Sequence, residues 1–251
     1  MPLPSISVVM VTRDRPELLL DALASVAAQR HAPLELCIAA DSPASCDPAT
    51  FPGALPGLRL SHSSLRQIAG SRNLAASTAR GECLAFLDDD DLWTPDHLAG
   101  FARAFADPEV DLAFRDIAVV LERESGGRRE EFARRVIAHD WDDELMRHDD
   151  FIAPSAMAVR RSLFERLGGF DTSFRFSEDW DFLLRAAVHT RPRRVSGVTC
   201  EIRLREAGNA SLDRGPERRA CLDRLASRHG LPALEIKTFW EVAAATAAVA
   251  R

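Results

Sequence analysis

The chain has 251 residues, 46% of them apolar, enough to build one large domain or two small ones around a full core. Its formal net charge is −6 and its basic residues are scattered, so the composition does not suggest a nucleic-acid partner. The apolar runs at residues 6–11 and 242–250 are too short to span a membrane. The five cysteines are odd in number and lack the close spacing of a zinc or redox motif, so we expect a reducing, cytoplasmic compartment.

Short apolar runs in the first half of the chain predict buried parallel strands over residues 6–11, 34–40, 58–60 and 83–87. Helical patterns separate these runs. Asp14 and Pro16 form the start signal of the first helix, with Asp14 as its cap, and the helix continues to about Val26. A second helix is predicted over residues 67–78, and a third opens at Thr94. This alternation predicts a doubly wound α/β sheet, in which ligands bind beyond the carboxyl ends of the strands.

From residue 110 the pattern changes. Strands are predicted over residues 110–114 and 117–121, followed by a turn at Gly126 and Gly127 and a charged segment that ends at Asp150. The remaining predicted elements are a strand over 156–159, a short helix ending at Gly168 and Gly169, a helix over 177–188, a strand near 198–204 and C-terminal helices. Neither an internal repeat nor a linker demands a second independent domain.

Polar residues follow three of the predicted strands: Thr12 the first, Asp41 the second, and four consecutive aspartates, residues 88–91, the last. In a parallel sheet these positions line one crevice. Four carboxylates in a closed crevice repel one another unless a cation shares them, and magnesium and manganese prefer carboxylate and phosphate oxygens. A solvated acidic turn at the start of the next helix is the alternative interpretation of the same run.

Several motifs in a fixed order give the chain a specific resemblance. They are SVVMVTRDRPELL at residues 7–19, residues 25–29, Asp41, SRN at 71–73, Gly81, FLDDDDLW at 86–93, RSLFERLGGFD at 161–171 and EDWDFLLR at 178–185. Over roughly residues 6–187 the chain resembles a family 2 glycosyltransferase of the GT-A fold. The order of the motifs, rather than any one of them, carries the resemblance.

The resemblance implies an α/β protein with the GT-A, Rossmann-like fold, in which helices flank a mainly parallel central sheet. The glycosyltransferase domain would span residues 1–215, with a nucleotide-binding half of about 1–92 and an acceptor half of about 93–215. Residues 216–251 would form a helical extension packed on the same domain. The implied reaction moves a sugar from a nucleotide-diphosphate donor, UDP-sugar favoured, to a hydroxyl of a carbohydrate, lipid-linked or small-molecule acceptor. It proceeds with inversion and is assisted by Mn²⁺ or Mg²⁺.

Carried over by position, the resemblance implies that Thr12 and Asp41 contact the nucleoside and that Arg13, in the same motif as Thr12, belongs to the donor site. It also implies a cation near the nucleotide, either Arg66 or Arg72, and a planar guanidinium suits phosphate or base edges. The alternative is a purely structural role: Asp41 would be a turn residue at the end of a strand, and the two arginines would be solvent-facing helix residues.

Within the acidic run, the resemblance implies that Asp90 is the direct metal ligand, supported by Asp88. Asp88 or Asp89 would contact the ribose or a metal-bound water. Because every position of the run is Asp, the register stays open by one residue, and Asp91 is either a supporting residue or the start of the next turn.

Asp179 is the candidate catalytic base. Direct displacement at the anomeric carbon needs a carboxylate on the acceptor side to take the hydroxyl proton, opposite a leaving group whose charge a metal stabilises. The alternative is a helix-start acid paired with Arg185. Glu178 is a supporting candidate. Trp180 and Trp93 are candidates for stacking on a sugar, although aromatic residues beside a site are at least as often packing.

One segment departs from the family pattern. Many relatives carry a His or a basic motif late in the chain that reaches the metal or the diphosphate, and here Arg203 or Arg205 is the candidate replacement, with Asn209 and Ser211 in a closing loop. The segment over residues 231–250 could pack on the core, form a homodimer contact or lie peripherally on a membrane, the last being least favoured because it has no basic face.

The main competing function is a nucleotidyltransferase of similar fold. Such enzymes usually have a Gly-rich basic loop after the first strand, where this chain has TRDRP at residues 12–16. A dehydrogenase is excluded because neither its Gly-rich turn nor a P-loop occurs in the sequence. A catalytically inert binding domain would be favoured if other residue types replaced the carboxylates of the motifs, but all of these carboxylates are present.

Overall fold

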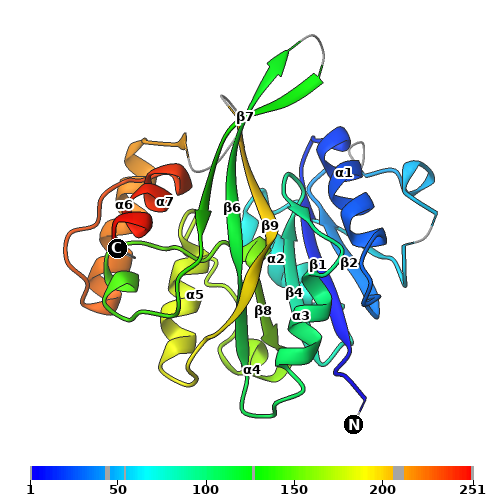
Figure 1. Ribbon diagram of the computed structural model, residues 1–251, viewed down its shortest axis with the longest axis horizontal. Coiled ribbons are helices and arrows are strands. Elements are labelled where there is room, and N and C mark those ends of the chain that lie inside the picture. The colour runs from blue at the N-terminus through cyan, green and yellow to red at the C-terminus, as the bar shows by residue number, and fades with distance from the viewer. Residues whose placement is uncertain (1, 43–45, 54, 126–127, 206–211, 250–251) are drawn as a thin grey trace.

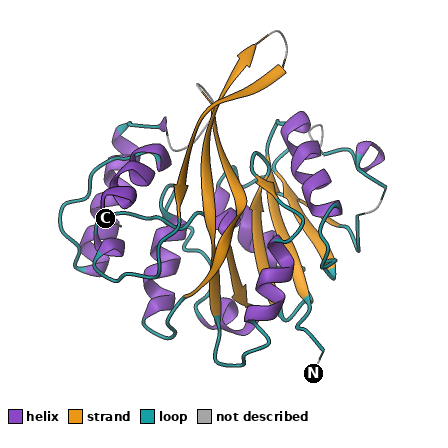
Figure 2. Cartoon of the chain, viewed as in Figure 1, coloured by secondary structure: helices purple, strands orange, loops and turns teal. Residues whose placement is uncertain are grey.

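The computed structural model describes residues 2–42, 46–53, 55–125, 128–205 and 212–249. A twisted mixed sheet runs through the molecule and helices flank it (Figures 1 and 2). No helix within the described ranges is long and apolar enough to cross a membrane.

The first half of the sheet, which comprises its first four strands, is parallel, as predicted. Strands β1 (Ile6–Thr12), β2 (Glu35–Ala40), β3 (Arg59–His62) and β4 (Cys83–Asp88) lie in the order β3-β2-β1-β4. Each pairs in parallel with its neighbour. Their carboxyl ends therefore meet at one edge, where the sequence places Thr12 and the acidic run.

The second half of the sheet is mixed. Strand β8 (Met157–Arg160) runs antiparallel between β4 and β6 (Leu112–Ser125). Strand β9 (Arg193–Arg205) lies parallel to β6 and also pairs antiparallel with β5 (Leu92–Trp93). The two strands predicted over 110–114 and 117–121 are one strand, β6, because its central charged pair, Arg115 and Asp116, is buried and has partners on β9.

The charged segment after β6 forms a further strand, β7 (Arg128–Ile137), which the sequence analysis did not predict. It pairs antiparallel with β6, and the outer part of the hairpin projects beyond the body of the molecule (Figure 1). Phe132 and Val136 on β7 are exposed, so its pattern lacks the apolar alternation of a half-buried strand. The predicted turn at Gly126 and Gly127 lies outside the described residues.

The helices are close to their predicted ranges. They are α1 (Pro16–Ala27), α2 (Ile68–Ser77), α3 (His97–Ala104), α4 (Arg161–Arg166), α5 (Glu178–Ala187), α6 (Pro216–His229) and α7 (Phe239–Val249), with short 3₁₀ turns at Pro48–Thr50, Leu145–Arg147 and Pro154–Ala156. The prediction that Asp14 caps α1 was wrong. Asp14 has a left-handed backbone with φ of 53°, and Arg15 occupies the cap position without a side-chain capping bond.

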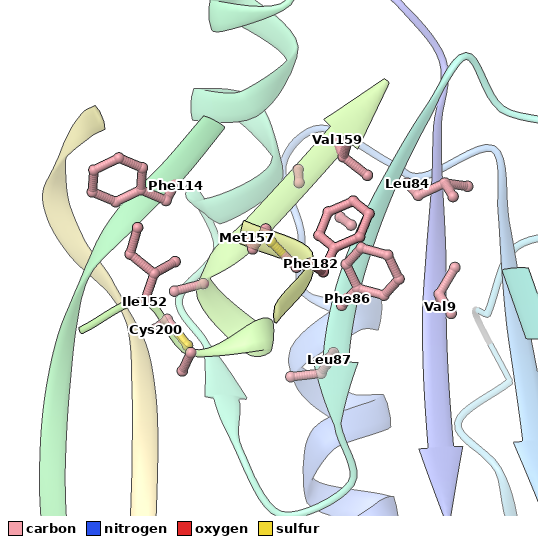
Figure 3. Close-up of a cluster of buried hydrophobic side chains, with 14 of the residues drawn as sticks. Val9, Leu84, Phe86, Leu87, Phe114, Ile152, Met157, Val159, Phe182 and Cys200 are labelled. Carbon is pink, nitrogen blue, oxygen red and sulfur yellow. The ribbon is translucent and has the colours of Figure 1, made fainter. Parts of the chain in front are cut away.

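Apolar residues from both halves of the chain pack into one core (Figure 3). Phe86 on β4 contacts Phe170 edge-on, with ring centroids 5.2 Å apart, and Phe170 lies 5.1 Å from Phe182 on α5. Asn73 on α2 brackets the Phe170 main chain by donating to its carbonyl and accepting from its N–H. These contacts fix α5 against the strand that carries the acidic run.

A buried carboxylate joins β1 and β2 to the turn before β4. Glu35 accepts from the Ser7 hydroxyl at 2.8 Å, the Arg59 Nε at 2.6 Å and the Arg80 main-chain N–H at 2.5 Å. Burial alone would raise the pKa of Glu35, but these donors lower it to about 2. Gly81 lies beside this cluster, and a Cβ there would stand 2.6 Å from the main-chain nitrogen of Ser7.

The C-terminal helices pack on the rest of the chain. On α6, Arg228 and His229 both reach the buried Asp181 of α5, at 3.0 and 2.9 Å. Arg135 of β7 stacks over the Trp240 ring of α7 at 4.0 Å and donates to the Trp240 carbonyl.

Candidate active site

A pocket opens beyond the carboxyl ends of β1 and β4. Its walls come from the β1–α1 turn, the acidic run, the segment around the start of α5, the end of β9 and the C-terminal segment. Among the described residues, nine carboxyl groups and six basic side chains line it, so the pocket has an acidic balance that favours a bound cation.

Two aspartates of the run are buried and accept hydrogen bonds from other side chains of the protein. Asp89 is 5% exposed and accepts from the Thr12 hydroxyl at 2.7 Å, and burial followed by the charge of Asp90 raises the pKa of Asp89 to about 6. Asp91 accepts from the Ser155 hydroxyl at 2.5 Å, and burial raises its pKa well above the ordinary value. Asp91 therefore supports the site from within the protein.

The other two aspartates are nearer to solvent and accept from guanidinium groups. The Asp88 side chain is 23% exposed, and both of its carboxylate oxygens accept from Nη2 of Arg72, at 2.7 and 2.8 Å. The Oδ2 atom of Asp90 accepts from Nη1 of Arg15 at 2.8 Å and from Nη2 of Arg205 at 2.5 Å. The metal roles that the resemblance assigns to Asp88 and Asp90 stay predictions.

Neither of the predicted nucleoside contacts, Thr12 and Asp41, is among the residues that line this pocket. The Thr12 side chain is buried, so in this structure its hydroxyl orders Asp89. Asp41 follows β2, accepts from the Ser71 hydroxyl at 2.8 Å and does not line the pocket. Arg66 is exposed and lies outside the pocket lining, whereas Arg72 is 3% exposed and points inward. Of the two arginines, Arg72 is therefore the one at the site.

The basic residue at the β1–α1 turn that reaches the run is Arg15, which the sequence analysis missed. Arg13, which was predicted to belong to the donor site, has a half-exposed side chain and donates its main-chain N–H to Asp89 at 3.3 Å. Arg15 lines the pocket and contacts Asp90. Arg15 directly precedes Pro16, at the cap position of α1, but the sequence alone did not distinguish it from Arg13.

Asp179, in the first turn of α5, lines the same pocket as the acidic run. Its Oδ1 accepts from the Trp180 N–H at 2.9 Å. Burial raises the pKa of Asp179, Asp88 raises it further, and the Arg72 charge opposes both. The alternative pairing with Arg185 is wrong, because Arg185 instead binds Asp181 at 2.7 Å.

A carboxylate that the sequence analysis missed lies beside Asp179. Asp150 lines the pocket, and burial, followed by the charge of Asp179, raises its pKa well above the ordinary value. Its Oδ1 accepts from the Ile152 N–H at 3.1 Å. Asp150 belongs to no motif, so the sequence carried no signal for it.

Arg72 joins the two sides of the pocket. Besides its pair with Asp88, it donates from Nη1 to Glu178 at 2.5 Å. Glu178 is 4% exposed, and burial, followed by the charge of Asp179, raises its pKa against the opposing charge of Arg72. One guanidinium thus ties the end of β4 to the start of α5.

The two tryptophan candidates have different positions. Trp180 lines the pocket, and its indole N–H donates to the Met146 carbonyl at 2.9 Å. Trp93 is buried outside the pocket lining, where it stacks on His97 with ring centroids 4.4 Å apart and donates to the Ser155 carbonyl. Trp93 is therefore a packing residue, and the suggestion that it stacks on a sugar was wrong.

The late basic candidates both reach the acidic run. Arg203 on β9 donates from its main chain to Asp91 at 3.1 Å and from Nε to the Asp90 carbonyl at 2.8 Å. Arg205, two residues on, reaches the Asp90 carboxylate. Asn209 and Ser211, predicted for a closing loop, lie outside the described residues.

Comparison with known proteins shows the family to which the chain belongs. The model of the family described as glycosyl transferase family 2 matches residues 7–168. This chain is a family 2 glycosyltransferase. An uncharacterized glycosyltransferase of Bacillus subtilis, YwdF, is 34% identical to it over 238 residues, covering 93% of this chain and 87% of the relative. The protein y4gI of Sinorhizobium fredii is 30% identical over 78% of this chain but 22% of its own length.

Solved structures show the fold of this glycosyltransferase. Residues 1–349 of S. aureus TarS, in complex with UDP-GlcNAc, superpose with a TM-score of 0.64 at 18% identity, over 89% of this chain and 66% of the TarS chain. The mannosyltransferase PcManGT from Pyrobaculum calidifontis, in complex with GDP-Man and Mn²⁺, gives a TM-score of 0.63 at 21% identity, over 99% of this chain and 75% of that one. The predicted GT-A fold is confirmed.

The residues of this glycosyltransferase fit a divalent cation of the hard, oxygen-binding kind. No group of three or more His, Cys, Asp or Glu side chains gathers at one point among the described residues. Asp88 and Asp90, however, both line the pocket and both accept from positively charged guanidiniums. Magnesium-type sites commonly use one or two carboxylates and complete their coordination with substrate phosphates and water. The donor set therefore suits Mg²⁺ or Mn²⁺ bound together with a diphosphate.

Proposed function

We propose that this glycosyltransferase moves a sugar from a nucleotide-diphosphate donor to an acceptor hydroxyl with inversion of the anomeric carbon. The observation that carries the proposal is that Asp179, in the first turn of α5, and the pair Asp88 and Asp90, at and after the end of β4, line one pocket. An inverting displacement needs both a base for the acceptor and a site for the leaving diphosphate, because these two groups lie on opposite sides of the reacting carbon. We favour a UDP-sugar, followed by TDP- and GDP-sugars.

In this reaction the acceptor oxygen forms a bond to the anomeric carbon as the bond to the diphosphate oxygen breaks. The acceptor proton goes to Asp179. When bound by Asp88 and Asp90, a divalent cation supplies positive charge to the diphosphate. The guanidiniums of Arg15 and Arg205, which already lie at the acidic run, add positive charge at the same place.

Asp179 is better placed as the base than its neighbours. Glu178 accepts a short hydrogen bond from the buried guanidinium of Arg72, which competes with an incoming proton for the same carboxylate. Asp179 instead accepts through Oδ1 from a neutral main-chain N–H, which competes less with an incoming proton than a guanidinium does. Burial raises the pKa of Asp179, as it raises those of Glu178 and Asp150, so the pKa alone does not distinguish the three carboxyl groups. Asp150, next to it, is the group to compare by substitution.

We also propose that residues 216–251 are part of the glycosyltransferase domain. Arg218 and Leu222 on α6, Lys237 before α7, and Phe239 and Val242 on α7 all line the pocket. Lys237 binds both carboxylate oxygens of Asp149 at 2.8 Å, which holds the C-terminal segment against the loop that carries Asp150. This segment would form the acceptor side of the site.

The test combines donor binding with transfer. UDP, TDP and GDP are screened by thermal shift with and without Mn²⁺, and transfer from the matching sugar nucleotides is then followed by release of the nucleotide diphosphate. Asp179→Asn should leave donor binding within about twofold of wild type and lower transfer by about 10²–10⁴-fold. Asp90→Ala should instead weaken the metal-dependent part of donor binding.

Asp223→Asn is the matched control, since it removes an exposed carboxylate of α6 that pairs with Arg219. It should change neither quantity. Full transfer by Asp179→Asn would show that another group is the base, and Asp150→Asn would then be the variant to follow. A binding-only protein would be stabilised by nucleotide and Mn²⁺ without any transfer.

A further inference from the structure

The four aspartates of the acidic run form one tight turn. Asp88 is the last residue of β4, and β5 begins directly after Asp91. The Asp91 N–H donates to the Asp88 carbonyl at 3.2 Å, which closes a four-residue β-turn. Four negative side chains on one turn repel one another, so contacts from outside the turn decide where each carboxylate points.

One hydroxyl group spans this turn. Ser155 Oγ accepts from the Asp88 N–H at 3.0 Å and donates to the Asp91 carboxylate at 2.5 Å. A serine hydroxyl has a single proton, so both contacts have a fixed direction. The first and the last residue of the turn are therefore held by the same oxygen atom.

Ser155 is itself held in place. It is 0% exposed in the 3₁₀ turn that precedes β8, and its carbonyl accepts from the Trp93 indole N–H at 2.6 Å. Its neighbours Ala153 and Pro154 line the pocket, whereas Ser155 does not. Ser155 therefore acts on a ligand in the pocket only through the aspartates that it contacts.

We propose that Ser155 is a positioning residue for the metal-binding turn, which directs the carboxylates of Asp88 and Asp90 toward a divalent cation. This inference rests on the proposed function. The side chains of Asp88 and Asp90 are 23% and 13% exposed, whereas Asp91, which accepts the proton of the Ser155 hydroxyl, is 5% exposed. Groups that hold metal ligands from outside the coordination sphere commonly contribute about 10–100-fold to metal affinity.

Removing the hydroxyl would release both ends of the turn. The Asp88 N–H would lose its acceptor at the end of β4, and Asp91 would keep the main-chain N–H of Arg203, at 3.1 Å, as a donor. An unpaired main-chain N–H inside the protein is costly, so the end of β4 would shift toward another partner. The carboxylates would then lose the arrangement that the cation requires.

The test is isothermal titration calorimetry of UDP, or of GDP if that is the nucleotide that binds, with and without Mn²⁺. The readout is the ratio of the dissociation constants without and with Mn²⁺, since Mn²⁺–UDP association in solution affects every variant equally. Ser155→Ala should reduce this ratio by about tenfold. Ser155→Cys, whose thiol is a weaker donor and acceptor than a hydroxyl, should lie between the two and keeps the test decisive if the alanine variant does not fold.

Ser7→Ala is the matched control. Ser7 on β1 is also 0% exposed, and its hydroxyl donates to Glu35 at 2.8 Å and accepts from the Gly81 N–H at 2.9 Å. The same two kinds of contact are lost in both alanine variants, so both should lower the melting temperature to a similar extent. Only Ser155→Ala should change the Mn²⁺-dependent ratio.

A ratio for Ser155→Ala equal to that of wild type, or an equal loss in Ser7→Ala, would overturn the positioning role. Wild-type UDP and GDP binding that Mn²⁺ does not strengthen would also overturn it, while nucleotide-sugar transfer would still stand. If wild type binds none of UDP, TDP and GDP with or without Mn²⁺, the proposed function itself fails, and this inference fails with it.

Discussion

Replacing Arg72 with Met should destabilise the protein, because it breaks a buried ion group that joins the two sides of the pocket. The Arg72 side chain is 3% exposed, and its partners Asp88 and Glu178 are 23% and 5% exposed. Asp88 can be hydrated once the guanidinium is gone, but Glu178 would stay in the protein interior. Removing one partner of a buried pair costs about 3–5 kcal/mol, and because the partial exposure of Asp88 offsets part of this, we expect about 3 kcal/mol.

Urea unfolding of Arg72→Met, Glu178→Gln and the double variant measures this cost as a change in the unfolding free energy. Because the double variant leaves no buried charge at position 178, it should be at least about 1 kcal/mol more stable than the sum of the two single effects. A single-variant cost below about 1 kcal/mol, or strictly additive effects, would refute the assignment of Arg72 as the link between β4 and α5.

Two further predictions concern the frame that holds the site. Gly81→Ala should lower the free energy of unfolding by about 1–3 kcal/mol, because the added Cβ would stand 2.6 Å from the Ser7 nitrogen. Gly53→Ala is the control, because a Cβ at Gly53 would have no atom within 4 Å. Equal melting temperatures for the two variants would contradict this prediction. Glu35 has a folded pKa of about 2 against an ordinary 4.5, so its ionised form adds about 3 kcal/mol of stability above pH 4.5 that is lost as the pH falls toward 2. Urea unfolding of Glu35→Gln should show that deficit at pH 7 and a smaller one at pH 3, and a deficit that does not change with pH would count against the buried cluster.

The sequence predicted the N-terminal, parallel half of the sheet well for a physical reason. Strands β1, β2 and β4 are buried on both faces, and such strands appear as short continuous apolar runs. Strand β6 appeared as two separate apolar runs, and β7 gave no such signal. Arg115 and Asp116 look like a break in β6, yet their partners Thr199 and Arg194 lie about eighty residues away, a distance that no local pattern reveals.

The sequence predicted the carboxylates of the candidate site better than its basic side chains. Asp88, Asp90 and Asp179 occur in ordered motifs, and the structure brings them to one pocket. A long arginine side chain can reach in several directions from the same turn, so position in the sequence did not separate Arg15 from Arg13. The interpretation of Arg72 as a nucleotide contact also needed the tertiary structure, which shows it between two carboxylates.

The four residues of the acidic run are all aspartates, but each has a different environment in the structure. Thr12 holds Asp89, Ser155 holds Asp91, and guanidiniums hold Asp88 and Asp90. A sequence alignment that is shifted by one position within this run still matches Asp with Asp. It would, however, equate a partly exposed carboxylate of one protein with a buried carboxylate of the other. Homologues should therefore be aligned here by the strand register of β4 with β1, where Asp88 stands beside Val11, and not by the acidic letters themselves.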